Sequence, residues 1–220
     1  MLKLMYITNN PEVAKIADET GVDRVWIDLE SKGKELRQFR RKIGMVFQSF
    51  NLVNKTSVIN NVLSAKVADM SVFRTLFGLY SKEDKLQALE SLDKVGILDK
   101  AFSRADMLSG GQMQRVALAR TLTQDPEIIL ADEPVASLDP IMADVVMEDF
   151  CRINREMNIT VIINIHHVDL ALQYANRVVG INSGRIVYDG PTKDVNKDIL
   201  RQIYGRDLNE DDVMKEKVDA

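Results

Sequence analysis

The chain has 220 residues, of which 45% are hydrophobic and 28% are charged, a composition typical of an ordinary globular protein with one or two domains. Its net charge of -4 comes from acidic and basic residues that are interspersed along the chain, which excludes a basic surface for wrapping nucleic acid. One cysteine, Cys151, excludes an internal disulfide. No apolar run approaches the roughly 18 residues that cross a bilayer, so we expect any membrane association to come through a partner.

The first thirty residues predict a strand, a helix and a second strand. Residues 2–8 and 22–30 have the apolar and β-branched pattern of strands, and the helix between them begins at Pro11 and stops at Gly21. Such a βαβ unit joins two parallel strands. From residue 31 to 42 the composition changes abruptly to charge, and we place a boundary there.

Beyond this boundary, strands alternate with helices. A short apolar strand covers residues 43–47, and two continuous apolar runs, 128–131 and 160–165, are typical of strands buried on both faces of a parallel sheet. Residues 178–181 and 185–188 predict a hairpin, and the tail after Gly205 is acidic and polar. The helical patterns cover residues 57–69, 82–95, 109–123, 141–157 and 168–175. The alternation predicts an α/β fold.

Residues 108–112 open the third of these helices with the sequence Leu-Ser-Gly-Gly-Gln. Gly110 and Gly111 let backbone amides approach a ligand, and the helix dipole favours an anion at this end. The segment is therefore a candidate phosphate site. The alternative is a plain capping box, because Ser109 and Gln112 stand three residues apart and would cap any helix.

Two carboxylates follow the apolar strand 128–131, at the edge of the sheet where α/β proteins bind ligands. Asp132 suits a Mg²⁺ ion held through its water shell, and Glu133 suits polarising a water that attacks a γ-phosphate. The alternative is that both are ordinary solvated loop residues. Downstream, Asp139 followed by Pro140 predicts at least a capped helix start.

The second apolar strand ends on His166, where an imidazole could contact a γ-phosphate and order the attacking water. His167 beside it is the competing candidate, and a lone histidine is more often structural. Gln48 follows the strand 43–47 and could touch a metal ion or a water, although one glutamine after a strand carries little information alone.

Taken in order, these segments resemble the Q-loop, signature, Walker B, D-loop and switch histidine of ABC ATPases. The amino-acid sequence around Glu133 and His166 is most similar to that of the ATP-binding subunits of phosphonate importers. The resemblance covers about Lys34 to Gly205 and implies a P-loop NTPase-like nucleotide-binding domain. The segments are residues 46–52, 108–112, 128–134, 137–139 and His166.

The resemblance implies ATP and Mg²⁺ as ligands and a head-to-tail dimer, either of identical or of different ABC subunits. Gln48, Asp132, Glu133 and His166 would then act on one nucleotide, with Asp132 and Gln48 at the metal ion and Glu133 and His166 catalytic. The expected partners are transmembrane permease subunits and a solute-binding protein, at the cytoplasmic face of the membrane. Ser109, Gly111 and Gln112 would reach across to the nucleotide of the other subunit. The full set of residues expected to bind nucleotide is Gln48, Ser109, Gly110, Gly111, Gln112 and Asp139.

The chain departs from the family in one motif. The phosphate loop G-x-x-x-x-G-K-[ST], whose amides and lysine hold the phosphates, is absent from the sequence. Gly33 precedes Lys34, but Asp28 stands where the motif has its first glycine and Glu35 where it has a hydroxyl residue. We therefore expect impaired catalysis and assign no adenine-stacking aromatic.

Residues 1–30 instead resemble the opening βαβ unit of a TIM-barrel aldolase of the HpcH/HpaI type. A barrel needs eight such units, so aldolase activity is not expected. We interpret the chain as two reading frames joined near Gly33, by recombination or by an assembly error, with segments 1–33, 34–205 and 206–220. Two hypotheses follow: an importer ATPase that is inactive as this chain, or a non-catalytic partner that donates the signature motif to an intact subunit.

Overall fold

The computed structural model describes residues 5–8, 24–27 and 40–208. The helix predicted from Pro11 and the end of the acidic tail lie outside the described residues, as does most of the predicted boundary at 31–42. Strands β1 (Met5–Thr8) and β2 (Arg24–Ile27) pair in parallel, which confirms the two parallel strands predicted at the start of the chain. They form a sheet of their own.

The central sheet has the order β3-β4-β5 and all three strands run parallel. Its strands are β3 (Ile43–Val46), β4 (Ile128–Asp132) and β5 (Thr160–Asn164), close to the predicted ranges. In the register, Ala131 of β4 lies opposite Val46 of β3 on one side and Ile163 of β5 on the other. The carboxyl ends of the three strands therefore meet at one edge.

Burial of the two apolar strands differs from the sequence-based expectation. Ile129 and Ala131 in β4 are 0% and 3% exposed, as expected of a central strand. In β5 only Val161 is buried, and Ile162 and Ile163 are half-buried. The expectation was wrong for β5 because, among the described strands, β4 has neighbours on both sides and β5 has one.

The predicted helices are present with small differences at their ends. The pattern over 57–69 gives an α-helix only as far as Leu63 and a 3-10 helix beyond it, because residues 64–69 bury no side chain. Two short helices were not predicted, at Val72–Leu76 and Lys197–Tyr204. The α-helices are α3 (Val58–Leu63), α4 (Val72–Leu76), α5 (Lys82–Lys94), α6 (Gly110–Leu122), α7 (Pro140–Met157), α8 (Val168–Tyr174) and α9 (Lys197–Tyr204). Short 3-10 helices cover Ser64–Asp69, Leu98–Lys100, Ala105–Met107 and Thr192–Asp194.

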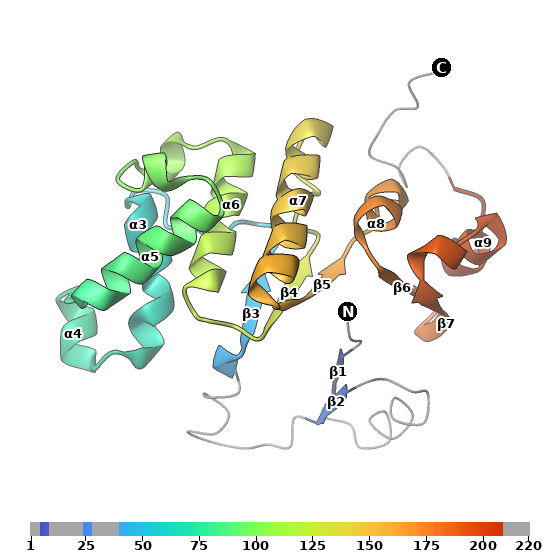
Figure 1. The fold of residues 1–220 in the computed structure, drawn as a ribbon, viewed down its shortest axis with the longest axis horizontal. Helices are drawn as coiled ribbons and strands as arrows, with labels where there is room; N and C mark the ends of the chain where they lie inside the picture. Colours follow the sequence, from blue (N-terminus) through green and yellow to red (C-terminus); the bar gives the residue numbers. More distant parts are fainter. Residues whose placement is uncertain (1–4, 9–23, 28–39, 209–220) are drawn as a thin grey trace.

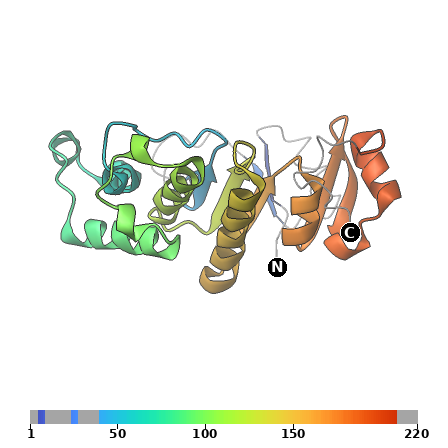
Figure 2. The ribbon, with the colours of Figure 1, turned by 90° about the horizontal axis from the view of Figure 1, so that it is seen from above.

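One apolar core joins the sheet to the helices. Phe150 of α7 is 2% exposed and belongs to the same cluster as Leu92 of α5, Leu118 of α6 and Ile129 of β4. Figures 1 and 2 show α3 to α6 at one end of the molecule and α7 beside the strands β3 to β5. None of the helices that the structure describes has the length and apolar composition required to cross a membrane.

The predicted hairpin is confirmed by β6 (Arg177–Asn182) and β7 (Arg185–Pro191), which pair antiparallel. Its turn places Ser183 and Gly184 at φ 51° and 74°, the left-handed pair that suits the twist of a two-residue hairpin. Helix α9 packs on this hairpin. The hydroxyl of Tyr204 at the end of α9 donates to the carbonyl oxygen of His166 at 2.8 Å, so the C-terminal unit is tied to the carboxyl edge of the central sheet.

Candidate functional site

The carboxyl edge of the central sheet collects the polar residues singled out in three separate parts of the sequence. Gln48 lies two residues beyond β3, Asp132 ends β4 with Glu133 next to it, and His166 lies two residues beyond β5. Because the strands are parallel and in register, these residues emerge at the same edge, where open α/β sheets bind their ligands.

Asp132 and Glu133 are both held by a residue that the sequence analysis did not single out, Asn164. The side-chain amide of Asn164 donates from Nδ2 to Oδ1 of Asp132 at 2.8 Å. The backbone carbonyl of Asn164 accepts a hydrogen bond from the N–H of Glu133 at 2.9 Å. Glu133 has φ 45°, a left-handed conformation that turns the chain sharply after β4.

The structure brings His166, rather than His167, to the acidic pair. Nδ1 of His166 lies 3.3 Å from Oε1 of Glu133, and both side chains are partly exposed. His167 packs with its ring centroid 4.0 Å from that of His166, and its Nδ1 is buried without a hydrogen-bond partner among the described residues. Burial, and then the neighbouring His166, lower the pKa of His167 below its ordinary value.

The lowered pKa of His167 predicts an acid-sensitive contribution to stability. The folded chain takes up this proton less readily than the unfolded chain, so the stabilisation is complete above about pH 6.5 and falls as the pH drops further. We expect His167→Gln to flatten the dependence of the free energy of unfolding on pH below about pH 6.5. Urea denaturation at several pH values measures this free energy. The same change of the unfolding free energy with pH in both proteins would contradict the prediction.

The segment after Gln48 is fixed by an arginine from the helix α6. Arg120 donates to the carbonyl oxygens of Asn51 at 2.7 Å and of Phe50 at 3.2 Å. Burial lowers the pKa of Arg120 from its very high ordinary value, and its charge is met by these carbonyl oxygens. Asn51 itself has φ 51°. The loop therefore depends on α6 for its shape, whereas Gln48 is exposed at the sheet edge.

The start of α6 shows the capping box that the sequence analysis gave as the alternative. The side chain of Ser109 accepts from the N–H of Gln112, and the side chain of Gln112 accepts from the N–H of Ser109. A side chain at Gly110 would meet Leu138 at 3.2 Å and Phe50 at 3.8 Å, so this helix start packs against two neighbouring loops. The capping hydrogen bonds leave the backbone N–H groups of Gly110 and Gly111 to donate hydrogen bonds to an anion.

Asp139 caps α7 as predicted, since its Oδ1 accepts from the N–H of Met142 at 3.0 Å and Pro140 occupies the first turn. Leu138 just before it packs against Gly110. The candidate residues thus fall into two groups. One group lies at the sheet edge, with Asp132, Glu133 and His166, and the other lies where the starts of α6 and α7 meet.

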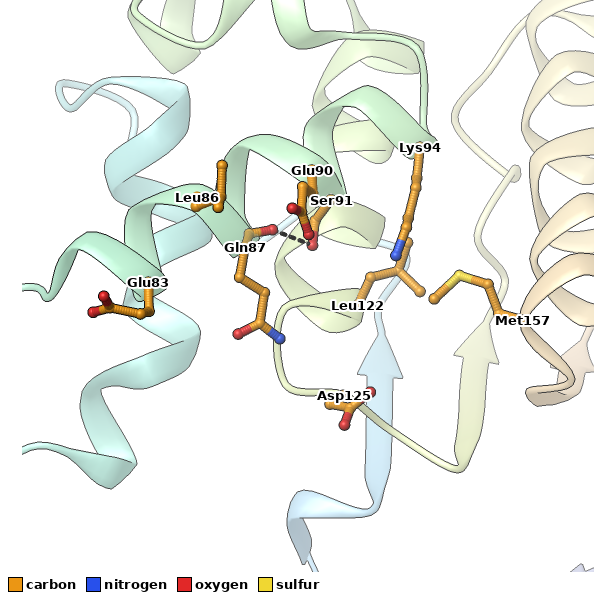
Figure 3. A pocket seen from close by; sticks show the side chains of 9 residues that line it. All are labelled: Glu83, Leu86, Gln87, Glu90, Ser91, Lys94, Leu122, Asp125 and Met157. Carbon is orange, nitrogen blue, oxygen red and sulfur yellow. Dashed lines mark hydrogen bonds between the residues drawn. The ribbon is translucent and has the colours of Figure 1, made fainter.

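A surface pocket elsewhere offers no better candidate (Figure 3). It lies between α5 and the ends of α6 and α7, on the side where the strands begin. Its charged lining is mostly acidic, with Lys94 as the one cation against three carboxylates, which disfavours an anionic ligand. The acidic lining residues are Glu83, Glu90 and Asp125.

The donor groups at the sheet edge decide whether it suits a divalent cation. Among the described residues no group of three or more His, Cys, Asp or Glu side chains could hold a metal ion. Mg²⁺ needs fewer protein ligands, because it keeps several waters and binds one or two carboxylates together with substrate phosphates. The exposed carboxylate of Asp132 fits this kind of site, with Gln48 as a neighbour at the same edge.

A parallel sheet with two acids and a histidine at its carboxyl edge, next to two capped helix starts, defines an α/β domain of the nucleoside-triphosphatase class. The chain belongs to the ABC transporter family, whose pattern matches residues 2–136. The match includes residues that the sequence analysis set apart from the core. The division at Gly33 and the aldolase resemblance stay predictions.

Relatives of the chain share a large part of its sequence. It is 56% identical over 201 residues to a protein described as "Phosphonates import ATP-binding protein PhnC" from Lactococcus lactis subsp. lactis, covering 91% of this chain and 76% of the relative. A protein of the same description from Mesoplasma florum is 49% identical over 206 residues, covering 94% of this chain and 83% of the relative. The predicted family and the resemblance to phosphonate importers are confirmed.

Solved structures support the same family. A protein described as cbiO1 from Clostridium perfringens, "part of the ABC transporter complex cbiONQ", has a TM-score of 0.68 at 26% identity, over 93% of this chain and 84% of that chain. The dimeric cassette MJ0796 has a TM-score of 0.63 at 27% identity, over 88% of this chain and 87% of that chain. A further structure of MJ0796 is bound to ADP and Pi.

Proposed function

We propose that this chain is the ATPase subunit of an ABC importer for phosphonate or a related anion, bound to a permease at the cytoplasmic face of the membrane, with its catalysis impaired by the missing phosphate loop. The observation that carries the proposal is the assembly at the sheet edge, where the side chains of Glu133 and His166 approach within 3.3 Å beside Asp132. The descriptions of the relatives from L. lactis and M. florum supply the solute class.

Each residue of this edge has a role that its chemistry supports. Glu133 is the general base, because its carboxylate can take a proton from a water that attacks the γ-phosphate. His166, whose Nδ1 lies 3.3 Å from Oε1 of Glu133, would contact the γ-phosphate and order that water. Asp132 and Gln48 would hold Mg²⁺ through its waters, and the ion would neutralise charge on the phosphates.

The second group of residues supports a dimer in the proposal. Ser109, Gly110, Gly111, Gln112 and Asp139 lie around the starts of α6 and α7, where backbone amides favour an anion. In a head-to-tail dimer this surface closes over the nucleotide of the other subunit. The dimeric relative MJ0796 shows that cassettes of this fold assemble in pairs.

An exposed apolar surface supports a protein partner. Helix α4 and the residue that follows it leave Val72, Phe73, Leu76 and Phe77 between 60% and 85% exposed. Val53, which follows residues 46–52, is 60% exposed. A monomer rarely leaves so many large apolar side chains together in water. The proposed partner is the permease, with a solute-binding protein on its other side.

A second candidate function follows from the missing phosphate loop. The start of α6 is fully formed, with both hydrogen bonds of its capping box, although the sequence holds no G-x-x-x-x-G-K-[ST]. The chain could therefore serve as a non-catalytic partner that completes the site of an intact subunit. One complete site would then exist in each mixed dimer.

A mixed-dimer assay separates the two functions. An ABC subunit that carries the G-x-x-x-x-G-K-[ST] loop, chosen as a relative of this chain, is first inactivated by a substitution in its own signature motif, and this chain is then added. We expect ATP turnover to return, because this chain supplies Gly110 and Gly111 to the nucleotide held by the relative. Measured phosphate release should fall by about 100-fold with Gly111→Asp in this chain, because the added carboxylate repels the phosphates from the backbone amides, and losing one such donor costs about this much.

The controls assign the effect to the signature surface. Ser183→Asp, in the hairpin turn and far along the chain from α6, should leave the restored turnover unchanged. Glu133→Gln in this chain should also leave it unchanged if the chain is only a donor. Failure of this chain to restore any turnover would contradict the donor function, and a loss with Glu133→Gln would show that this chain's own site works.

A further inference from the structure

Asn164 is the last residue of β5 and lies directly opposite Asp132 in the parallel register. Neighbouring side chains at the same level of a sheet lie on the same face, so the amide of Asn164 and the carboxylate of Asp132 face the same space. Their contact is a hydrogen bond of 2.8 Å from Nδ2 of Asn164 to Oδ1 of Asp132. Both side chains are exposed at the carboxyl edge.

The chemistry of this contact fixes the carboxylate without occupying it. A carboxylate offers about four lone-pair positions on its two oxygens. Each N–H of a primary amide can occupy one of these positions. One donor from Asn164 therefore holds Oδ1 in a set direction and leaves most of the acceptor positions of Asp132 for a cation and its waters. The amide oxygen of Asn164 remains a further acceptor at the same edge.

The backbone of Asn164 acts on the next residue as well. Its carbonyl oxygen accepts the N–H of Glu133 at 2.9 Å, at the point where Glu133 adopts φ 45°. A non-glycine residue in this region is strained, and this hydrogen bond helps to hold it there. Asn164 thus contacts both acids of the site, one through its side chain and one through its main chain.

We propose that Asn164 is a positioning residue whose side chain orients the Asp132 carboxylate for a divalent cation. The inference rests on the proposed function, in which Asp132 is the residue that holds Mg²⁺. It adds a specific prediction, because partners that orient a metal-binding side chain commonly change metal affinity by 10- to 100-fold when they are removed.

A purely structural role predicts a different outcome. An exposed hydrogen bond adds little to folding, since both groups bond water in the unfolded chain. Removing the Asn164 side chain would then cost a small amount of stability and leave cation affinity unchanged. Measuring metal binding directly therefore separates orientation of Asp132 from general support of the strand.

The test uses Mn²⁺ alone, added to the unmodified chain and to its variants, with paramagnetic broadening of backbone amide signals at the ends of β4 and β5 as the readout. We expect Mn²⁺ to broaden signals around Asp132 and to bind Asn164→Leu about 10-fold more weakly. Asn164→Gln keeps an amide donor and should recover part of the affinity. Asn164→Ala serves as a second variant if the leucine side chain prevents folding.

Asn154→Leu is the matched control. Asn154 donates from Nδ2 to the carbonyl oxygen of Ile159 at 2.8 Å, a comparable hydrogen bond near the other end of β5. Its loss should lower stability and leave Mn²⁺ affinity as it was. Equal Mn²⁺ affinity for Asn164→Leu and the unmodified chain would overturn the proposal, as would broadening that avoids Asp132. This test contains no nucleotide and no partner protein. Evidence against the importer function itself would therefore come only from the ATP and mixed-dimer assays.

Discussion

Replacing residues 1–33 with the strand and phosphate loop of an intact homologue is expected to raise ATP turnover by about 10³-fold or more. The sequence provides a candidate base, Glu133, but no loop of amides and lysine to hold the phosphates. A base without a positioned substrate contributes little, because holding reactants in place accounts for a large part of the acceleration of such reactions. The unmodified chain should therefore release phosphate at the background rate.

Two measurements accompany this exchange. Calorimetry should show Mg-ATP binding by the restored protein and none by the unmodified chain. In the restored protein, Glu133→Gln should abolish turnover while leaving binding intact, whereas Glu127→Gln, an exposed acid before β4, should change neither. Mg-dependent turnover by the unmodified chain that disappears with Glu133→Gln would contradict the prediction and point to a phosphate site in its first 33 residues.

Elements with a strong local pattern were predictable from the sequence. Helix α7 begins at Pro140 after the Asp139 cap and ends at Met157 before Asn158, whose φ of 53° stops the helix. The apolar run of β4 predicted the central strand, and the turn at Gly184 predicted the hairpin. The order of the polar residues along the chain also placed His166 and Glu133 at the same edge.

Features that depend on contacts between distant segments were not predictable. Arg120 reads as an exposed helical residue, yet its partners are carbonyl oxygens about seventy positions earlier. Asn164 reads as the end of a strand, and only the register of β4 and β5 shows that it faces Asp132. The burial of β5 also depends on its neighbours in the sheet, which no local pattern specifies.

Among the polar residues, Asp149 is expected to cause the largest loss in the free energy of unfolding when its side chain is removed. Its side chain is 5% exposed and accepts from Nε of Arg115 at 2.8 Å and from Nη2 of Arg152 at 2.6 Å. Arg115 belongs to α6, the helix that opens with the signature residues, and Arg152 also donates to the carbonyl oxygen of Lys94 at the end of α5. Asp149 therefore links α7 to α6 directly and to α5 through Arg152.

Asp149→Ala should lower the free energy of unfolding by about 3 kcal/mol, because it leaves the partly buried guanidinium of Arg115 without its carboxylate. Urea denaturation measures the change as a lower midpoint with an unchanged slope. The exposed neighbour Glu148 gives a matched control on the same helix, and Glu148→Ala should stay within about 0.5 kcal/mol of the unmodified chain. Similar midpoints for the two variants would show that the contacts of Asp149 with the arginines are no stronger than those of a surface pair, and that the apolar core alone holds α6 against α7.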